Sequence, residues 1–375
     1  MTKKPIIIIS VFWAILQIIY YYKLRSFIGF ESNKYIYEAQ FVNAFHHFSY
    51  PHYYLYSLYI FLHVFFMKLG FELYGVYFTQ LICSYIATLL FYKILLHTIE
   101  NKRLAFAGIL LWLCCFHFHR FTAFLYTESL FGSFIIIQAY WLLFKPFNNR
   151  NLILLSILSL IVILARPTGI VFIPIWVSYW VFNLFQKRKT VAAITVIVSM
   201  LLAVSGMLYL IVSRTDMGFN FIIPFTHNYV QCYVFDKTLQ EYSLNITNDG
   251  NPVYIFFYYL LHNPLHFLHA AWLKTIAYFS ITRSYYSGLH NMFIRAFYYP
   301  IYLSGILAIW TNRKQLPLWI VYSMISIIFF TISIILTCED WSSRFIIPIT
   351  PFIILLGIKG IDSMMKIYLG KDREA

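Results

Sequence analysis

The chain has 375 residues, of which 61% are hydrophobic and only 11% charged, and its mean hydropathy is +0.71. A soluble domain carries roughly a quarter charged residues, so this composition excludes an ordinary water-soluble protein. Apolar runs near the ~20-residue length that crosses a bilayer recur along the whole chain. The sequence therefore predicts an all-α, polytopic transmembrane bundle. No long polar linker divides it, so residues 1–375 are expected to form one integral-membrane domain.

The net charge of +14 arises from 28 Lys and Arg residues against 14 Asp and Glu residues. Because the positive charges fall in short segments between apolar runs, they indicate membrane topology and contacts with membrane lipids rather than with nucleic acid. The five cysteines are scattered and show no metal-ligand spacing. We therefore expect neither a disulfide framework nor a zinc site.

The first apolar run, about residues 5–22, follows two lysines that keep the amino terminus inside. The outer loop that follows, residues 23–52, is expected to contain a short interfacial helix over 34–48. Residues with helical spacing give this helix one apolar side. They are Tyr35, Ala39, Val42 and Phe45.

Further apolar runs bring the expected total to about 10–11 spans. They lie at about 53–70, 74–96, 104–118, 124–144, 152–165, 168–185, 191–213, 291–311, 317–338 and 345–365. The charge pattern requires a single crossing between residues 53 and 96, which contain two apolar runs. Either the 53–70 run does not span fully or one loop is assigned to the wrong side.

Placing every basic segment inside leaves the candidate polar residues outside, in the first loop, at Glu128, at Arg166 and at 339–344. The same assignment places residues 214–290 outside as the longest loop. Within it, Asn263-Pro264 is a typical helix start, and 264–281 is expected to form an outer-surface helix.

Two acidic residues are candidates for chemistry. Glu31 lies just outside the first span, where a carboxylate can act as a general base, although a solvated loop residue is the plainer interpretation. Glu128 begins an apolar run, and an acid there is costly unless it is functional. The alternative for Glu128 is a first-turn residue that the helix dipole favours.

Arg166 lies between two apolar runs and could bind phosphate through paired N–H donors, or simply sit at the interface where Pro167 breaks the helix. The segment that links the last two long runs carries Glu339, Asp340 and Arg344. Arg344 could hold a phosphate with either acid positioning it. The alternative is a tight turn of snorkelling charges.

Taken together, these residues resemble the GT-C superfamily of membrane glycosyltransferases, which includes polyprenyl- or dolichyl-phosphate-sugar-dependent mannosyltransferases and lipid A aminoarabinose transferases. The matched features are spread over nearly the whole chain. They are Glu31 with Tyr35 and Ala39, Tyr50-Pro51, Thr127-Glu128-Ser129-Leu130-Phe131, Arg166-Pro167 with Gly169, and Glu339 with Arg344-Phe345, Pro348 and Pro351. The family's first-loop acid is usually Asp, often paired with a second acid, whereas here it is a single Glu31.

The resemblance implies an inverting transfer of a sugar from a lipid-linked phosphate donor to an acceptor hydroxyl on a glycan, lipid or protein. Glu31 would be the base, and Glu128 would bind sugar or orient Glu31. Arg344, with Arg166, would stabilise the departing lipid phosphate, and Tyr35, Glu339 and Asp340 would line the substrate site. Some relatives use a divalent metal near the first-loop acid, and the sequence gives no evidence for or against one.

The family pattern also implies a core-only member in a bacterial inner (plasma) membrane, with its active site facing outside. A transporter or flippase of lipid-linked sugars is the leading alternative, but it would more often show internal repeats, which this sequence lacks. An O-antigen ligase or polymerase would favour large Arg-rich outer loops. A purely structural subunit would not need Glu128 or Arg166.

Overall fold

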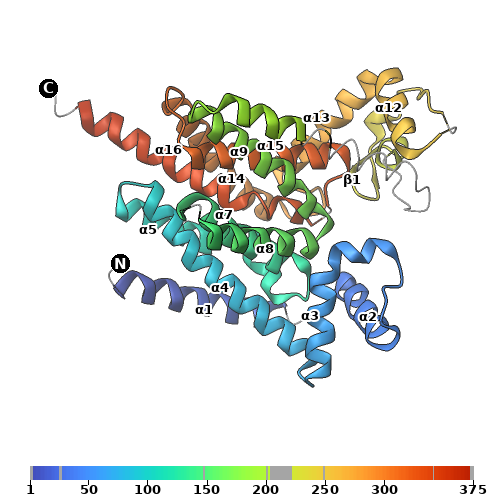
Figure 1. The fold of residues 1–375 in the computed structure, drawn as a ribbon, viewed down its shortest axis with the longest axis horizontal. Coiled ribbons are helices and arrows are strands. Elements are labelled where there is room, and N and C mark those ends of the chain that lie inside the picture. Colours follow the sequence, from blue (N-terminus) through green and yellow to red (C-terminus); the bar gives the residue numbers. More distant parts are fainter. Residues whose placement is uncertain are drawn as a thin grey trace. The chain divides into compact units, whose positions relative to one another are not determined.

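The computed structural model describes residues 3–24, 28–146, 148–199, 202, 222–247, 250–340 and 342–371. These residues are helical almost throughout, which confirms the predicted all-α class (Figure 1). The chain forms two compact units. Unit 1 comprises Met1–Phe172, Tyr298–Ser323 and Ile347–Ala375, and unit 2 comprises Ile173–Phe297 and Met324–Ile346. The expectation of a single domain stays a prediction.

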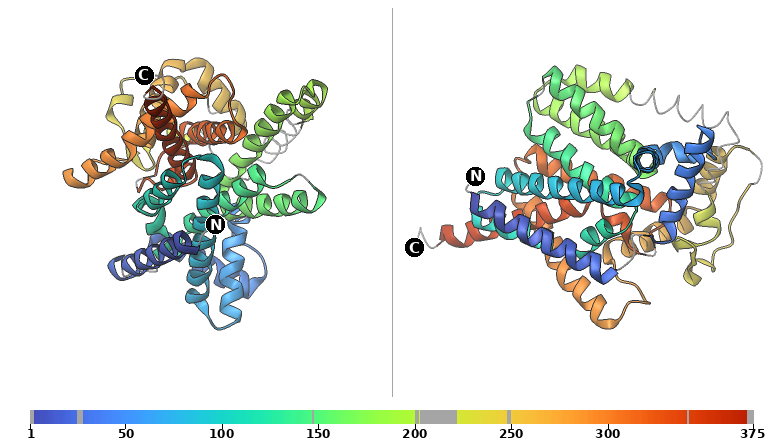
Figure 2. Two further views of the ribbon diagram at one scale, coloured as in Figure 1. Left: turned by 90° about the vertical axis from the view of Figure 1, so that its left-hand side faces the viewer. Right: turned by 90° about the horizontal axis from the view of Figure 1, so that it is seen from below.

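Elements of the first 172 residues pack around the long helix α4, which contacts α1, α3, α5 and α7. Dark-blue α1 lies alongside cyan α4 and α5 in both views of Figure 2. The elements are α1 (Lys3–Leu24), α2 (Phe30–Phe45), η1 (Pro51–Tyr56), α3 (Ser57–Lys68), α4 (Glu72–Thr98), α5 (Lys102–Leu113), α6 (Phe116–His119), η2 (Arg120–Ala123), α7 (Thr127–Phe144), α8 (Asn149–Ala165) and η3 (Pro167–Val171).

The rest of the chain supplies α9, the small elements of the long loop and the last helices. Within unit 2, α13 packs on α12 and on β1, which pairs antiparallel with β2. The elements are α9 (Phe172–Gln186), α11 (Ile223–Thr226), β1 (Tyr229–Gln231), β2 (Val234–Phe235), η5 (Lys237–Leu239), α12 (Pro252–His262), α13 (Pro264–Ser280), α14 (Gly288–Thr311), α15 (Leu318–Leu336), η6 (Arg344–Ile346) and α16 (Thr350–Lys371). The predicted helix over 264–281 is confirmed as α13.

Six helices in the described part of the chain are long and apolar enough to cross a membrane, and the bent pair of α5 with α6 and η2 would make a seventh. This is fewer than the 10–11 spans expected from the sequence. With 17 residues, α8 rises about 25 Å, short of a hydrocarbon core of ~30 Å. Helix α16 is long but carries charges such as Lys359 and Asp362. Most of the expected 191–213 span lies outside the described residues.

The two apolar runs between residues 53 and 96 differ in length. Helix α3 has only 12 residues, a rise of about 18 Å, whereas α4 has 27 residues and is one of the six candidate spans. The structure therefore offers one spanning helix in this stretch, as the charge pattern requires.

Helix α2 begins at Phe30, four residues earlier than the predicted start at 34. Gly29 N–H donates to Ser32 Oγ at 3.1 Å, and Ser32 N–H donates to the Gly29 carbonyl at 3.0 Å. These reciprocal bonds satisfy donors at the helix start without the usual Ser, Thr, Asp or Asn cap. Glu31 is consequently a first-turn helical residue rather than a loop residue. Of the predicted apolar side, Phe45 is the exception, because it is exposed.

Helices α14 and α16 approach closely through small residues within unit 1. A side chain at Gly360 would overlap the backbone carbonyl of Ser304, and one at Gly357 would overlap Ile301. Small residues allow such close backbone approach between membrane helices.

Replacing Gly360 with Leu is expected to lower the free energy of unfolding of the detergent-solubilised protein by about 1–3 kcal/mol, because the overlap is with backbone and cannot be relieved by a rotamer change. Thermal unfolding monitored by intrinsic fluorescence would measure the loss. Gly288→Ala is the matched control, since a side chain there meets open space. An equal effect of both substitutions would contradict the packing argument.

Candidate functional site

The seven predicted site residues fall into two clusters, one in each compact unit. The unit 1 cluster contains Glu31, Tyr35, Glu128 and Arg166. The unit 2 cluster contains Glu339, Asp340 and Arg344.

The unit 1 cluster centres on a buried ion pair between Glu128 and Arg166. Arg166 Nη1 donates to Glu128 Oε1 at 2.7 Å, and the Arg166 and Glu128 side chains are only 8% and 1% exposed. Thr127 Oγ1 donates to the other carboxylate oxygen at 3.3 Å. A charge-assisted bond of this length is among the stronger hydrogen bonds in proteins. Both residues predicted as costly intramembrane charges are therefore partners of each other.

The chain at Arg166 is shaped by the residues that follow it. Pro167 disfavours helical backbone at the preceding position, and Arg166 is extended, with φ −165° and ψ 146°. At Gly169 a side chain would overlap the carbonyl oxygen of Val162, so the chain can fold back on α8 only with glycine there. The Arg-Pro-x-Gly pattern thus directs Arg166 away from the helix and toward α7.

Glu31 and Tyr35 are one helical turn apart on α2, so they share a face. The Tyr35 side chain is hydrogen-bonded to Thr127 and to Tyr56, and it is fully buried, which raises its pKa well above the usual value. Glu31 is partly buried. Beside it, Gly29 touches Tyr126 so closely that a side chain at position 29 would overlap the Tyr126 hydroxyl. The starts of α2 and α7, each with an acid in its first turn, therefore lie together.

Lys34 joins this cluster and was not predicted. Its Nζ lies 4.4 Å from the ring centroid of Tyr56 and 5.5 Å from that of Tyr35, which are cation–π distances. Burial lowers the pKa of Lys34, the positive charge of Arg166 lowers it further, and Glu128 acts in the opposite direction. The sequence signal was available, because Lys34 is three residues from Glu31 and hence on the same side of α2.

Glu38, the other acid of the first outer segment, has a structural role. Its Oε1 accepts from Ser49 N–H at 2.7 Å, and its Oε2 accepts from the Ser49 hydroxyl. The carboxylate is buried and ties the end of α2 to the chain that follows.

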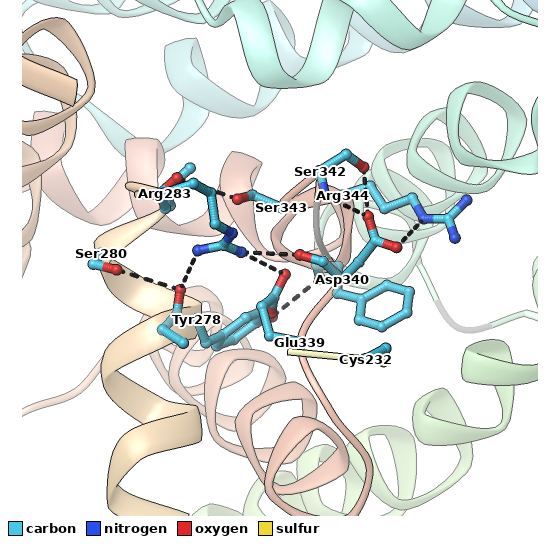
Figure 3. A network of polar contacts seen from close by, with 12 residues as sticks. Cys232, Tyr278, Ser280, Arg283, Glu339, Asp340, Ser342, Ser343 and Arg344 are labelled. Carbon is cyan, nitrogen blue, oxygen red and sulfur yellow. Dashed lines mark hydrogen bonds and ion pairs between the residues drawn. The ribbon is translucent and has the colours of Figure 1, made fainter. Parts of the chain in front are cut away.

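The unit 2 cluster is built on two ion pairs that flank one acidic segment (Figure 3). Arg283 Nη2 lies 3.5 Å from Glu339 Oε1 and donates to the Asp340 carbonyl at 3.0 Å. Arg344 Nε lies 3.0 Å from Asp340 Oδ1, and its terminal nitrogens point away from that carboxylate. Burial lowers the pKa of Arg344 to about 10, so Arg344 stays cationic at neutral pH. Arg283 is a partner that sequence reasoning missed.

The backbone beside this cluster is strained. Ile281 and Ser343 have φ values of 58° and 55°, and the left-handed region is a genuine outlier for a β-branched residue such as Ile281. Ser343 Oγ donates to the Ile281 carbonyl at 3.2 Å, so the two strained turns hold each other. Strain of this kind is often found at functional sites, where the surroundings impose it.

A disulfide joins Cys232 to Cys338, with the Cα atoms 5.1 Å apart. The expectation that the cysteines form no disulfide was therefore wrong. The two cysteines are 106 residues apart, a separation from which no spacing rule predicts pairing. A parallel bridge between Gln231 and Glu339 brings them together, with Cys232 N–H donating to the Glu339 carbonyl at 2.8 Å. The disulfide thus fixes the segment that carries both acids of the unit 2 cluster.

The described residues contain no group of three His, Cys, Asp or Glu side chains placed to hold a metal ion. Glu128 is in addition already engaged by Arg166.

No family model matches this sequence, and no curated protein matches it either. A comparison of folds does find a match, to the archaeal oligosaccharyltransferase AglB from Archaeoglobus fulgidus, solved in complex with an inhibitory peptide and a dolichol-phosphate. The TM-score is 0.53, and the alignment covers 99% of this chain at 12% identity. The chain has a GT-C fold. It spans about half of AglB, since the alignment covers 51% of that protein.

The buried ion pair gives a first prediction for this site. Glu128→Ala or Arg166→Ala is expected to lower the free energy of unfolding by about 3–5 kcal/mol, because either change leaves a buried charge without its partner. The double variant should lose clearly less than the sum of the two, since no lone charge remains. Thermal unfolding in detergent measures all three.

Glu100→Gln is the control for these variants, because Glu100 pairs with Lys366 at an exposed position and such pairs contribute little. Strict additivity of the Glu128 and Arg166 losses would show that the two side chains do not interact in the folded protein.

The disulfide gives a second prediction. Thiol labelling of the unfolded, unreduced protein should modify three cysteines, Cys83, Cys114 and Cys115, and labelling after reduction should modify five. Reductant should also lower the melting temperature of the wild type but not of the Cys232→Ser variant, because the cross-link restricts the unfolded chain. Cys83→Ser keeps the bond and serves as control. Five reactive thiols before reduction would rule the bond out.

Proposed function

We propose that this protein is a membrane glycosyltransferase that moves a sugar from a polyprenyl-phosphate donor to an acceptor hydroxyl, with inversion at the transferred carbon. The observation that carries the proposal is the unit 1 cluster, in which a partly buried acid and a buried Glu–Arg pair meet at the start of two helices of a GT-C fold. The dolichol-phosphate in the AglB structure supports a lipid-linked donor.

Glu31 is proposed as the general base. It would take the proton of the acceptor hydroxyl while the hydroxyl oxygen bonds to the anomeric carbon and the bond from that carbon to the phosphate oxygen breaks. Glu128 is less suited to this task, because its carboxylate accepts a charge-assisted bond from Arg166 and is shielded from solvent. Glu128 would instead orient the sugar or Glu31, with Tyr35 beside it.

The lipid phosphate leaves with a negative charge that has to be stabilised as it develops. Arg344 is the proposed partner of that phosphate, with Glu339 and Asp340 holding the arginines of the unit 2 cluster in place. In the unit 1 cluster, Arg166 and Lys34 supply positive charge near Glu128. The acceptor would be a glycan, a lipid or a protein.

We further propose that the site faces the outside of a bacterial plasma membrane. Disulfides form in oxidising compartments and are rare in the cytosol, which supports an outer position for Cys232 and Cys338. Two candidate spans, α14 and α15, separate these cysteines in sequence, so a double crossing returns the chain to the same side. The basic segments that flank the spans favour the same orientation.

Purified protein in detergent, incubated with radiolabelled polyprenyl-phosphate sugars and cell-envelope lipid and glycan fractions, should transfer label. In the Glu31→Gln variant, transfer is expected to fall by about 10²–10⁴-fold with expression unchanged, because the amide cannot accept the proton. Glu72→Gln is the matched control, since Glu72 is also a first-turn helical acid but lies exposed on α4.

Full activity of Glu31→Gln would place the base elsewhere. Label that binds to the wild type and to Glu31→Gln but is transferred by neither would favour a flippase. Movement of the labelled lipid across reconstituted liposomes would then be measured.

A further inference from the structure

Helix α13 has its polar and apolar faces reversed relative to a helix on a water-exposed surface. Its buried face repeats every four residues and carries three polar side chains. The buried residues are His266, Ala270, Lys274 and Tyr278. Its exposed face is a stripe of purely apolar side chains, which we call the α13 stripe. The stripe consists of Leu265, Leu268, Trp272 and Ile276, with Leu265 70% and Trp272 64% exposed.

Each polar group on the buried face has its partners inside unit 2. The two ring nitrogens of His266 lie 2.5 Å from the Tyr259 hydroxyl and 3.1 Å from Asn228 Oδ1. Tyr278 donates to the Phe345 carbonyl at 3.2 Å. These contacts account for the inward direction of the polar side chains.

Lys274 shows where α13 lies relative to a candidate span. Its Nζ donates to the carbonyls of Ile335 and Thr337 at 3.1 and 2.6 Å, and it sits 3.8 Å from the ring centroid of Phe225. Ile335 and Thr337 lie at the carboxyl end of α15, where a cation is favoured by the helix dipole. Lys274 therefore places α13 next to the carboxyl end of α15, a candidate membrane span.

We infer that the α13 stripe contacts membrane lipid, with α13 lying in the interfacial layer at the end of α15. In water, a surface helix turns its polar side outward and its apolar side to the core, whereas lipid requires polar groups to be satisfied within the protein. Ile332 and Leu336, near the carboxyl end of α15, are also apolar and exposed. Trp272 is a residue type enriched at membrane interfaces.

Helix α12 supports this assignment. Its exposed side chains, apart from His262 at the end of the helix, also follow helical spacing and are aromatic or aliphatic. They are Tyr254, Phe257 and Leu261. The two helices are consecutive and pack on each other, and each exposes apolar side chains. The occupant that fits a surface of this composition is a bilayer of phospholipid.

Site-directed spin labelling tests the inference on the full chain. A background with Cys83, Cys114 and Cys115 replaced by Ser keeps the disulfide and leaves no other thiol. Nitroxides are placed at positions 268, 272 and 276, one per variant, and the protein is reconstituted in phosphatidylcholine–phosphatidylglycerol nanodiscs. The control is a nitroxide at Tyr233, an exposed position in the turn between β1 and β2 of the same unit.

The accessibility of each label to oxygen, which dissolves in lipid, is compared with its accessibility to a water-soluble nickel chelate. On the stripe, the oxygen-to-nickel ratio should be several times that at position 233. A ratio equal to that at 233 would show a water-facing stripe and overturn the inference. Low accessibility to both reagents would show that protein, such as a second copy of this chain, covers the stripe, and would overturn it too.

Discussion

Charge inside a membrane protein has to be paired within the protein, because lipid offers it almost no solvation. The Glu128–Arg166 pair meets this requirement, and much of unit 1 depends on it. It joins the start of α7 to the end of α8. Through Thr127 and Tyr35 the same hydrogen-bonded group extends to α2, which carries Glu31. Removing the pair would therefore disturb the position of the proposed base as well as the stability of the unit.

In unit 2, buried cations are stabilised by backbone carbonyl groups as well as by carboxylates, and a disulfide adds a covalent link. Its cations pair partly with carbonyl groups, as Lys274 does at the end of α15 and Arg283 does at Asp340. The disulfide at Cys338 and the strained turn at Ser343 lie on either side of Glu339 and Asp340 and fix the position of these two acids. Such a rigid frame holds the Arg344 side chain in one position, which is the condition under which the proposed stabilisation of the phosphate would need no reorganisation.

The site residues that could be predicted from the sequence are the charged residues that interrupt apolar runs. Glu128 and Arg166 stand out because an ionised side chain in an apolar run needs a reason. Lys34 is indicated only by its helical spacing from Glu31, since a lysine in an outer segment is ordinary, and its contacts with the surrounding tyrosines depend on the fold. The Cys232–Cys338 pairing was missed because contacts over such a separation in sequence leave no local pattern. The number of spans was overestimated from the sequence, because apolar runs such as those of α3 and α8 form helices too short to cross a bilayer.

The disulfide also constrains how the protein is made. Both spans α14 and α15 lie between its two cysteines in the sequence, so the bond cannot close until the second of these helices has been synthesised and inserted. An error that leaves one of them out of the membrane would place the cysteines on opposite sides and leave both thiols free. Closure of this bond is thus a late step of biogenesis that depends on correct insertion, and it completes the frame around Arg344.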